Sequence, residues 1–486
     1  MNRGFFAVID DRELPPAETQ RLCGDVHFGD LLRRRRRYLD ELHAAATQAD
    51  EVIILRNDEE AERLVRRIEA MRGEAIWLRM PTATAPLNMD AMGFLIAKMR
   101  YALETMVLSP VQADDAHMLL RPQQMITLLA AQSAKSKRAQ VLEIVQNATE
   151  VTHDLAFADL RQTASLSSFL SGATEPRAFN TLAADQEIYV KSSTDVAKMR
   201  AEHDFYALAR PEVQRFLLPT FGYEVQAGIA SYRMENLRVP DAALQFVLGS
   251  LDKAGFARLL DQFFAFINAR DRDAVGRAAV QDAGTQQILQ KLKDRLARFA
   301  DTEAFGRVNA ALKAGGVEDG LEGLNRRAEP LIARVLQDHG SDYLAFSHGD
   351  PCLSNILFDS RIGLFRLIDP RGATARAEAL MHPLYDLAKF SHSVLGGYDF
   401  INNELFAIEV RADLRIKLRY QGDGAPVWMR TAFEARLKAE GWDITAVRAV
   451  EASLFLSMLP LHLDHERKLL GFALIAQDIL NELETV

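Results

Sequence analysis

One stretch of the sequence, residues 345 to 372, places acidic and amide side chains at a spacing that a reaction could use. It reads AFSHGDPCLSNILFDSRIGLFRLIDPRG and contains, in order, Asp350, Asn355 and Asp369. Phosphoryl transfer needs an acidic residue beside the attacking hydroxyl, and an amide and a carboxylate that hold magnesium on the nucleotide phosphates. The types and order of these residues therefore predict Asp350 as the catalytic residue and Asn355 and Asp369 as metal ligands.

The elements that position these side chains are predicted to be a loop followed by a hairpin. Apolar runs at residues 356 to 358 and 364 to 368 would form the two strands, with Asn355 before the first and Asp369 after the second. The Asp-x-x-x-x-Asn spacing equals that of the protein-kinase catalytic loop, although Gly349 stands where an arginine is expected. A chance His-Gly-Asp turn before a hairpin is the alternative interpretation.

The motifs resemble those of the aminoglycoside phosphotransferase and choline kinase-like family, which are small-molecule kinases with the protein-kinase fold. The resemblance is carried by HGDPCLSNILFD, by LIDPRG, and by YDLAKFSHS at residues 385 to 393, which resembles the helix after the metal-binding aspartate. It spans about residues 166 to 486, and it is greatest to members found beside capsular polysaccharide or cell-envelope genes. It implies ATP and Mg²⁺ as cofactors, and as acceptor a small-molecule hydroxyl of a sugar or polysaccharide precursor.

A second set of residues, upstream of this stretch, is predicted to bind the nucleotide. A strand at residues 187 to 193 carries Lys191 and the next helix carries Glu202. A kinase needs such a pair, because the lysine binds the α- and β-phosphates and the glutamate holds the lysine. An unrelated surface lysine and glutamate are the alternative. The resemblance also implies an adenine-binding hinge and a short phosphate flap, which would be Met234, Glu235 and Asn236, and residues 171 to 174.

The acceptor is expected to lie over Asp350, against helices that follow the motif. Arg371 is the leading substrate contact, because it comes just after Asp369 in a phosphate-rich neighbourhood where a bidentate cation is useful. Histidines on apolar helices are more often hydrogen-bonded core residues than ligands. With that alternative open, the other substrate candidates are His382, His462 and Asp464. Asp386 is expected to brace the catalytic loop.

The composition narrows the class of protein. The formal net charge is -9 and the pI is near 5.8, which argues against nucleic acid as the main partner. The two cysteines, Cys23 and Cys352, form no CxxC pattern, so neither a disulfide framework nor a zinc site is expected. No apolar run reaches the roughly 18 residues that a membrane-spanning helix needs. The sequence therefore predicts a cytoplasmic protein without an integral membrane segment.

The chain is predicted to divide into an α/β amino-terminal domain with a small parallel sheet and an α+β bilobal protein-kinase-like domain with a mostly helical large lobe. Three apolar runs alternate with helical patterns in the first part. A helix is also expected at residues 402 to 419 of the large lobe. The expected boundaries are 1–108 for the α/β domain, 109–165 for a helical connector, 166–239 for the small lobe and 240–486 for the large lobe.

The role of residues 1–108 is open at this point. Asp10 and Asp11 end the first strand, where open α/β sheets often bind ligands, but no phosphate-binding glycine motif follows them. The arginine run at residues 33 to 37 is expected inside the first helix as a solvated face. A nucleotide-binding regulator or scaffold, with residues 1–108 as its surface for a protein partner, is the alternative to an enzyme.

Overall fold

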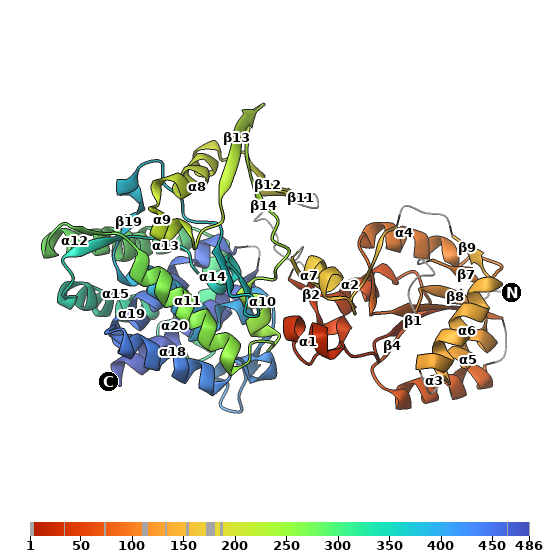
Figure 1. The fold of residues 1–486 in the computed structure, drawn as a ribbon. Coiled ribbons are helices and arrows are strands. Elements are labelled where there is room, and N and C mark those ends of the chain that lie inside the picture. Colours follow the sequence, from red (N-terminus) through yellow and green to blue (C-terminus); the bar gives the residue numbers. More distant parts are fainter. Residues whose placement is uncertain are drawn as a thin grey trace. The chain divides into compact units, whose positions relative to one another are not determined.

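A computed structural model of the chain describes residues 4–33, 35–71, 74–108, 115–131, 134–151, 155–171, 180–184, 188–463 and 465–485. The chain forms two compact units, Met1–Glu175 with Leu248–Ser250, and Pro176–Val247 with Leu251–Val486 (Figure 1). Within the described ranges, no helix is both long and apolar enough to cross a membrane.

The first unit has a sheet in which three neighbouring strands are parallel, as expected from its apolar runs. Strands β4 (Glu51–Leu55), β1 (Gly4–Asp10) and β5 (Ala75–Pro81) lie side by side in that order, and both pairings are parallel. The sheet continues beyond β5 with β8 (Met118–Leu120), β7 (Met106–Val107) and β9 (Thr149–Glu150). Because β8 is antiparallel to both of its neighbours, the sheet is mixed and larger than predicted.

Helices complete the first unit. A core that includes Val8, Trp77 and Met118 from the sheet is covered by α3 (Asp58–Ala70), α5 (Pro122–Leu129) and α6 (Ala134–Gln146). The remaining helices and strands described in this unit are α1 (Ala17–Cys23), α2 (Tyr38–Ala45), α4 (Met89–Met99), α7 (Thr163–Ser171), β2 (Leu32–Arg33), β3 (Arg36–Arg37), β6 (Thr84–Pro86) and β10 (Phe157–Asp159).

Two expectations for this unit are wrong. The arginine run lies in the β2–β3 hairpin and not in a helix, and Arg35 at its turn has a φ of 62°, which a helix does not contain. Residues 109–165 are not a connector, because β8 belongs to the central sheet and β10 pairs with β6. Strands of three residues are too short to show the two-residue alternation that identifies a strand in sequence.

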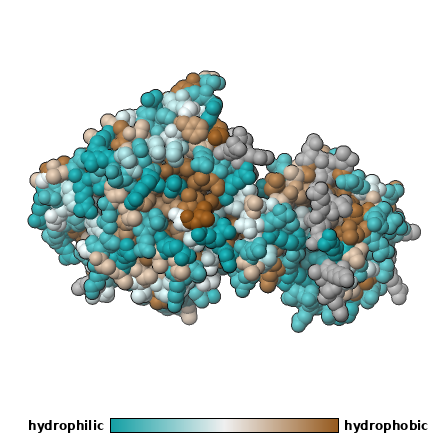
Figure 2. Space-filling view, viewed as in Figure 1, coloured by the Kyte–Doolittle hydropathy of each residue, from teal (hydrophilic) through white to brown (hydrophobic). Residues whose placement is uncertain are grey.

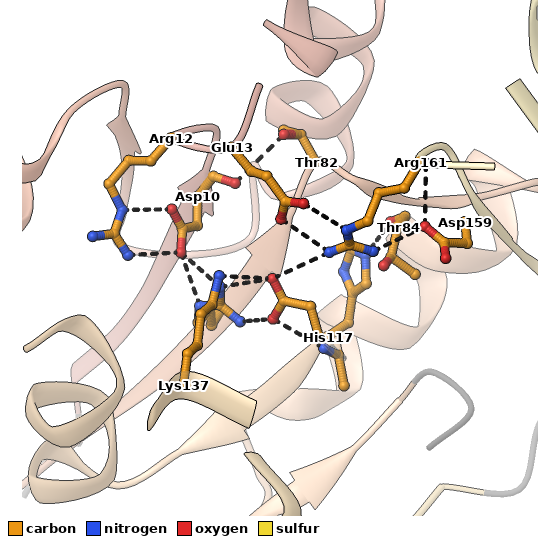
Figure 3. A network of polar contacts seen from close by, with 12 residues as sticks. Asp10, Arg12, Glu13, Thr82, Thr84, His117, Lys137, Asp159 and Arg161 are labelled. Atoms are coloured by element: carbon orange, nitrogen blue, oxygen red, sulfur yellow. Dashed lines mark hydrogen bonds and ion pairs between the residues drawn. The ribbon is translucent and has the colours of Figure 1, made fainter. Parts of the chain in front are cut away.

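Asp10, at the end of β1, takes part in a network of ion pairs and hydrogen bonds (Figure 3). Arg79 is 1% exposed and donates to both Asp10 and Asp115, and Arg12 also pairs with Asp10. Burial by itself would raise the pKa of Asp10, but the arginines outweigh it and hold that pKa well below its usual range. The Asp10 carboxylate thus contacts basic side chains of the same unit, whereas the Asp11 carboxylate pairs with Arg56 and also accepts hydrogen bonds from the Thr82 hydroxyl and the Gly29 amide.

The smaller part of the second unit is an antiparallel sheet with one packed helix, and it contains the strand predicted around Lys191 and the helix predicted around Glu202. The sheet order is β11 (Asn180–Ala184), β12 (Ile188–Ser193), β14 (Ile229–Glu235) and β13 (Thr220–Gln226). Helix α8 (Val196–Leu208) begins after Asp195, whose side chain accepts a hydrogen bond from the Lys198 amide at 3.0 Å. Ala227 and Gly228 both have positive φ, which forms the tight turn between β13 and β14.

The larger part of the second unit is mostly helical around one apolar core. Its short strands form the sheet β15 (Arg272–Ala274), β16 (Tyr343–Phe346) and β19 (Leu380–Met381) and two hairpins, β17 (Ile356–Asp359) with β18 (Leu364–Leu367) and β20 (Phe406–Val410) with β21 (Ile416–Tyr420). The α-helices described here are α9 (Pro211–Gln214), α10 (Ala242–Val247), α11 (Lys253–Ala269), α12 (Arg277–Gly284), α13 (Lys291–Ala300), α14 (Glu303–Ala314), α15 (Gly320–Asp338), α16 (Leu384–Val394), α17 (Tyr398–Asn402), α18 (Val427–Ala439), α19 (Ile444–Ser457) and α20 (Glu466–Glu484).

The β20–β21 hairpin corrects the helix expected at residues 402 to 419. Apolar residues alternate along each strand, for example Phe406 and Ile408 on β20 and Ile416 and Leu418 on β21. Leu414, between the strands, has a φ of 64°, which is incompatible with a helix interior. The apolar residues of this segment therefore follow the two-residue period of strands, and their three- and four-residue spacing, which is typical of a helix, is coincidental.

Candidate active site

The β17–β18 hairpin brings Asn355 and Asp369 to the same end of a two-stranded element. Ile356 pairs with Leu367, and the Ile368 amide donates to the Asn355 carbonyl at 3.0 Å. Ile356 and Leu367 are buried in the large core, which fixes the hairpin. The predicted hairpin is confirmed, and its pairing places the two expected metal ligands next to each other.

The loop that carries Asp350 is stabilised by hydrogen bonds to the buried carboxylate of Asp386. Asp386 on α16 accepts hydrogen bonds from the His348 and Gly349 amides at 3.1 and 2.8 Å, and Arg270 pairs with it at 3.1 Å. Gly349 has a φ of 80°, and a Cβ atom there would lie 2.7 Å from the Arg371 Cβ, so glycine is required. The expectation that Asp386 braces this loop is confirmed.

Asp350 itself lies beside a lysine and an asparagine. The Lys389 Nζ of α16 is 2.9 Å from the Asp350 Oδ1, and the Asn355 Nδ2 donates to the Asp350 carbonyl at 2.8 Å. Burial by itself would lower the pKa of Lys389, but the Asp350 carboxylate outweighs it and raises that pKa. Sequence reasoning missed Lys389, although a lysine within a helix whose other residues are nearly all buried was a signal.

Lys191, Glu202 and Asp369 form one ion cluster, in which Lys191 and Glu202 are buried and Asp369 is half-exposed. The Lys191 Nζ is 2.6 Å from the Glu202 Oε2 and 2.9 Å from the Asp369 Oδ1. The Tyr232 hydroxyl donates to the same Glu202 oxygen at 3.0 Å. Burial alone would lower the pKa of Lys191, but the two carboxylates outweigh it and the pKa is raised. The opposite balance holds for Asp369, whose pKa burial would raise and Lys191 lowers.

The segment after Asp369 packs against the helix that carries Glu202. Gly372 has a φ of 84°, and a Cβ atom there would lie 2.7 Å from the backbone of Ala201. The Ala373 amide donates to the Ala201 carbonyl at 3.0 Å. This contact fixes the segment after Asp369 relative to α8, so the pairing of Lys191 with both carboxylates depends on it.

The residues proposed for the hinge lie at the end of β14. Met234 is 8% exposed and lies opposite Tyr189 in the sheet, Glu235 is exposed and Asn236 is half-buried. The cluster around Met234 also contains Leu237, Leu357 and Ile368, so it draws apolar side chains from β14, β17 and the chain before Asp369. Apolar walls of this kind suit the faces of a planar base. Figure 2 shows apolar surface on the larger unit below the β13–β14 hairpin.

Two of the remaining candidates for substrate contact, His382 and His462, lie among the described residues. His382 is fully buried, its ring centroid is 4.9 Å from that of His339, and burial with that neighbour lowers its pKa to about 3. It is a core residue, so the expectation that it contacts an acceptor does not hold. His462 is half-buried beside Phe472, with 5.1 Å between ring centroids. Asp464 and residues 172 to 174 of the expected flap lie outside the described residues.

The donor set at the hairpin fits a magnesium ion shared with phosphates. Asp369 offers a carboxylate, and the carboxamide of Asn355 is oriented by its hydrogen bond to the Asp350 carbonyl. In the described ranges, no group of three or more His, Cys, Asp or Glu side chains could hold a metal by itself. Mg²⁺ is usually bound by one or two carboxylates together with substrate phosphates and water, so a site with few protein ligands is the expected kind.

Among known proteins, the chain resembles solved structures, at low sequence identity. No family model matches the chain, and no curated protein matches it. Among solved structures, the apo form of a thermostable mutant of aminoglycoside phosphotransferase APH(4)-Ia aligns at 8% identity with a TM-score of 0.36, covering 63% of this chain and 94% of that chain. A ternary complex of a mutant of that protein with AMP-PNP and hygromycin B aligns at 12% identity with a TM-score of 0.38, covering 65% and 98%. Because these scores are low, the function has to be inferred from the side chains of the chain itself.

Proposed function

We propose that the protein is an ATP- and Mg²⁺-dependent kinase that transfers the γ-phosphoryl group to a hydroxyl of a small molecule. The observation that carries this proposal is the double ion pair of Lys191 with Glu202 and Asp369, at 2.6 and 2.9 Å. Lys191 lies on a strand, Glu202 on a helix and Asp369 at the end of a hairpin. A buried lysine paired with two carboxylates in this way is the arrangement with which kinases bind nucleotide phosphates beside a metal.

Each residue then has a role in the reaction. Lys191 binds the α- and β-phosphates, while Asp369 and Asn355 hold Mg²⁺, which neutralises charge on the phosphates when it is bound. The backbone of Met234, Glu235 and Asn236 contacts the adenine edge. Asp350 orients the acceptor hydroxyl and accepts its proton. Rate acceleration comes mainly from positioning and from stabilisation of charge in the transition state.

The acceptor class is the finer part of the proposal. The motifs resemble those of kinases found beside polysaccharide genes, so a sugar or a polysaccharide precursor is the first acceptor to test. We propose separately that residues 1–108 bind a protein partner. A nucleotide-binding regulator without transfer activity has less support, because Lys191, Glu202, Asp350, Asn355 and Asp369 are all present and brought together.

The test is an acceptor screen. Protein and Mg-ATP are incubated with a library of sugars, sugar acids and amino alcohols, and ADP release is measured for the wild type and for Asp350→Ala. We expect at least one compound to raise ADP release in the wild type only, while ATP still raises the melting temperature of both proteins. Equal acceptor-dependent ADP release by Asp350→Ala would refute the assignment of Asp350.

A further inference from the structure

The side of Asp350 that faces α13 and α16 is unusually rich in cations. Tyr385 and Lys389 are one turn apart on α16, and Lys291 and Arg295 are one turn apart on α13. The Lys291 Nζ donates to the Tyr385 hydroxyl and lies 5.0 Å from the centre of its ring. Since Lys389 contacts Asp350 at 2.9 Å, this hydrogen bond brings Lys291 into the neighbourhood of the catalytic carboxylate.

Arg371 adds a further cation from the hairpin end. Its amide donates to the His348 carbonyl at 2.9 Å, and its Cβ packs closely over Gly349, one residue before Asp350. Neither the Arg371 guanidinium nor the Lys291 amino group forms an ion pair with a carboxylate among the described residues. The Arg295 guanidinium donates to the Ser457 carbonyl at 3.2 Å.

The electrostatic balance of this region is positive. Burial and the charges of Lys389, Arg371 and Arg295 lower the pKa of Lys291 to about 6, and the Asp350 carboxylate acts in the opposite direction. Asp350 is already paired with Lys389. A partly buried cation whose neighbours are also cations is costly unless an anion compensates it. A bound anion would restore the charge of Lys291 and remove that cost.

We propose that the acceptor carries an anionic group, a carboxylate or a phosphate, near the hydroxyl that is phosphorylated, and that Lys291 and Arg371 bind this group. The inference rests on the proposed kinase function and narrows its substrate class to acidic small molecules. A guanidinium and an ammonium that converge on one anion form charge-assisted hydrogen bonds and give directional recognition. The same cations could instead contact the phosphates of the nucleotide, and the experiment separates these two sources of negative charge.

The probe is inorganic phosphate, added to protein saturated with Mg-AMP-PNP so that the nucleotide phosphates are already in place. The melting temperature is measured against phosphate concentration, with chloride at equal ionic strength as reference. The variants are Lys291→Met, Arg371→Met and the double variant. Lys293→Met is the matched control, because Lys293 is on the same helix but is 44% exposed and pairs with Glu329 at 3.1 Å.

We expect phosphate to stabilise the wild type and Lys293→Met, and the double variant to bind it at least about tenfold more weakly. An equal phosphate effect in the double variant, or none in the wild type, would overturn the anionic acceptor. Phosphate that stabilises the free protein but not the Mg-AMP-PNP complex would also overturn it, because the cations would then bind the nucleotide. Failure of Mg-AMP-PNP itself to stabilise the wild type is seen before phosphate is added, and would instead overturn the kinase function.

Discussion

Asp350 and Asp369 are both carboxylates near the same hairpin, but their surroundings differ. Asp369 contacts Lys191 of the sheet, and that lysine lowers its pKa, so it remains charged and able to bind a metal. Asp350 contacts Lys389 of α16 on the side expected to face the acceptor. The two side chains should therefore differ in what their loss affects.

Substituting each aspartate by asparagine separates these roles. Asp369→Asn should weaken Mg-ATP binding as well as turnover. Asp350→Asn should leave ATP affinity nearly unchanged and lower kcat by about 100- to 10,000-fold, the usual range for a general base. Titrations with ATP at several magnesium concentrations, together with turnover rates, give both quantities. If Asp350→Asn abolished magnesium-dependent binding and Asp369→Asn did not, the two roles would be reversed.

Lys291 should make the stability of the protein depend on pH. Its folded pKa of about 6 lies below the reference value of 10.5, so the unfolded chain binds more protons between these values. Above about pH 10.5, Lys291 is neutral in both the folded and the unfolded chain, so its low folded pKa costs no stability there. As the pH falls toward 6, the unfolded chain takes up a proton that the folded chain does not, and the unfolding free energy of the wild type decreases. Lys291→Met removes this cost, so its gain in unfolding free energy over the wild type should be largest near pH 6.

Urea denaturation at pH 6, 7.5 and 9 measures this difference. The gain should shrink with rising pH by at most about 1.4 kcal/mol per pH unit. Lys293→Met, on the exposed face of the same helix, should show no such trend. A gain that does not change with pH would mean that the pKa of Lys291 is ordinary.

The contact between α8 and the segment after Asp369 joins the two elements that carry Glu202 and Asp369, the two carboxylates paired with Lys191. Gly372 meets the backbone of Ala201 and Glu202, whereas Gly363, in the turn between β17 and β18, has a similar φ of 66° and nothing within 4 Å of its missing Cβ. Both positions carry the intrinsic cost of a left-handed residue, about 1 to 2 kcal/mol for alanine. Only Gly372→Ala adds a clash with a backbone.

Gly372→Ala should therefore lower ATP affinity and turnover, while Gly363→Ala should change stability only. The clash would displace α8 or Asp369, and either movement separates Lys191 from one of its carboxylates. Nucleotide affinity measured by calorimetry, alongside the melting temperature of both variants, checks this. Equal ATP affinity in the two variants would show that the contact does not position the site.

The two units have separate cores, so damage to one should leave the other folded. Arg79 is 1% exposed between Asp10 and Asp115, and its removal would leave two buried carboxylates without their main partner. Breaking a buried pair from one side typically costs about 3 to 5 kcal/mol. Arg79→Ala should thus destabilise the first unit, whereas Arg63→Ala, at a 61% exposed side chain, should change little.

Differential scanning calorimetry with and without Mg-ATP tests this independence. We expect Arg79→Ala to lower one transition, and Mg-ATP to raise the other in both the wild type and the variant. A single transition that responds to both changes would show that the two units unfold together.

Local sequence determined the elements closest to the proposed chemistry. The apolar runs on both sides of Asn355 and before Asp369 are short, bounded by polar residues and paired in register, so spacing alone predicted the hairpin. The same holds for Lys191 on β12 and Glu202 on α8, because a strand, a cap and a helix follow one another within a few residues. Residues close in sequence are positioned by local geometry, which periodicity records.

Tertiary structure decided what distant segments do to each other. Lys191 meets Asp369 across 178 positions and Lys291 meets Tyr385 across 94, and no local pattern encodes such distances. Burial of His382 and the joining of β8 to the central sheet also depend on neighbours that the periodicity of a segment does not contain. The sequence by itself thus supplied the catalytic types and their order, whereas the cations around Asp350 come together only because helices α13 and α16 pack in the folded core.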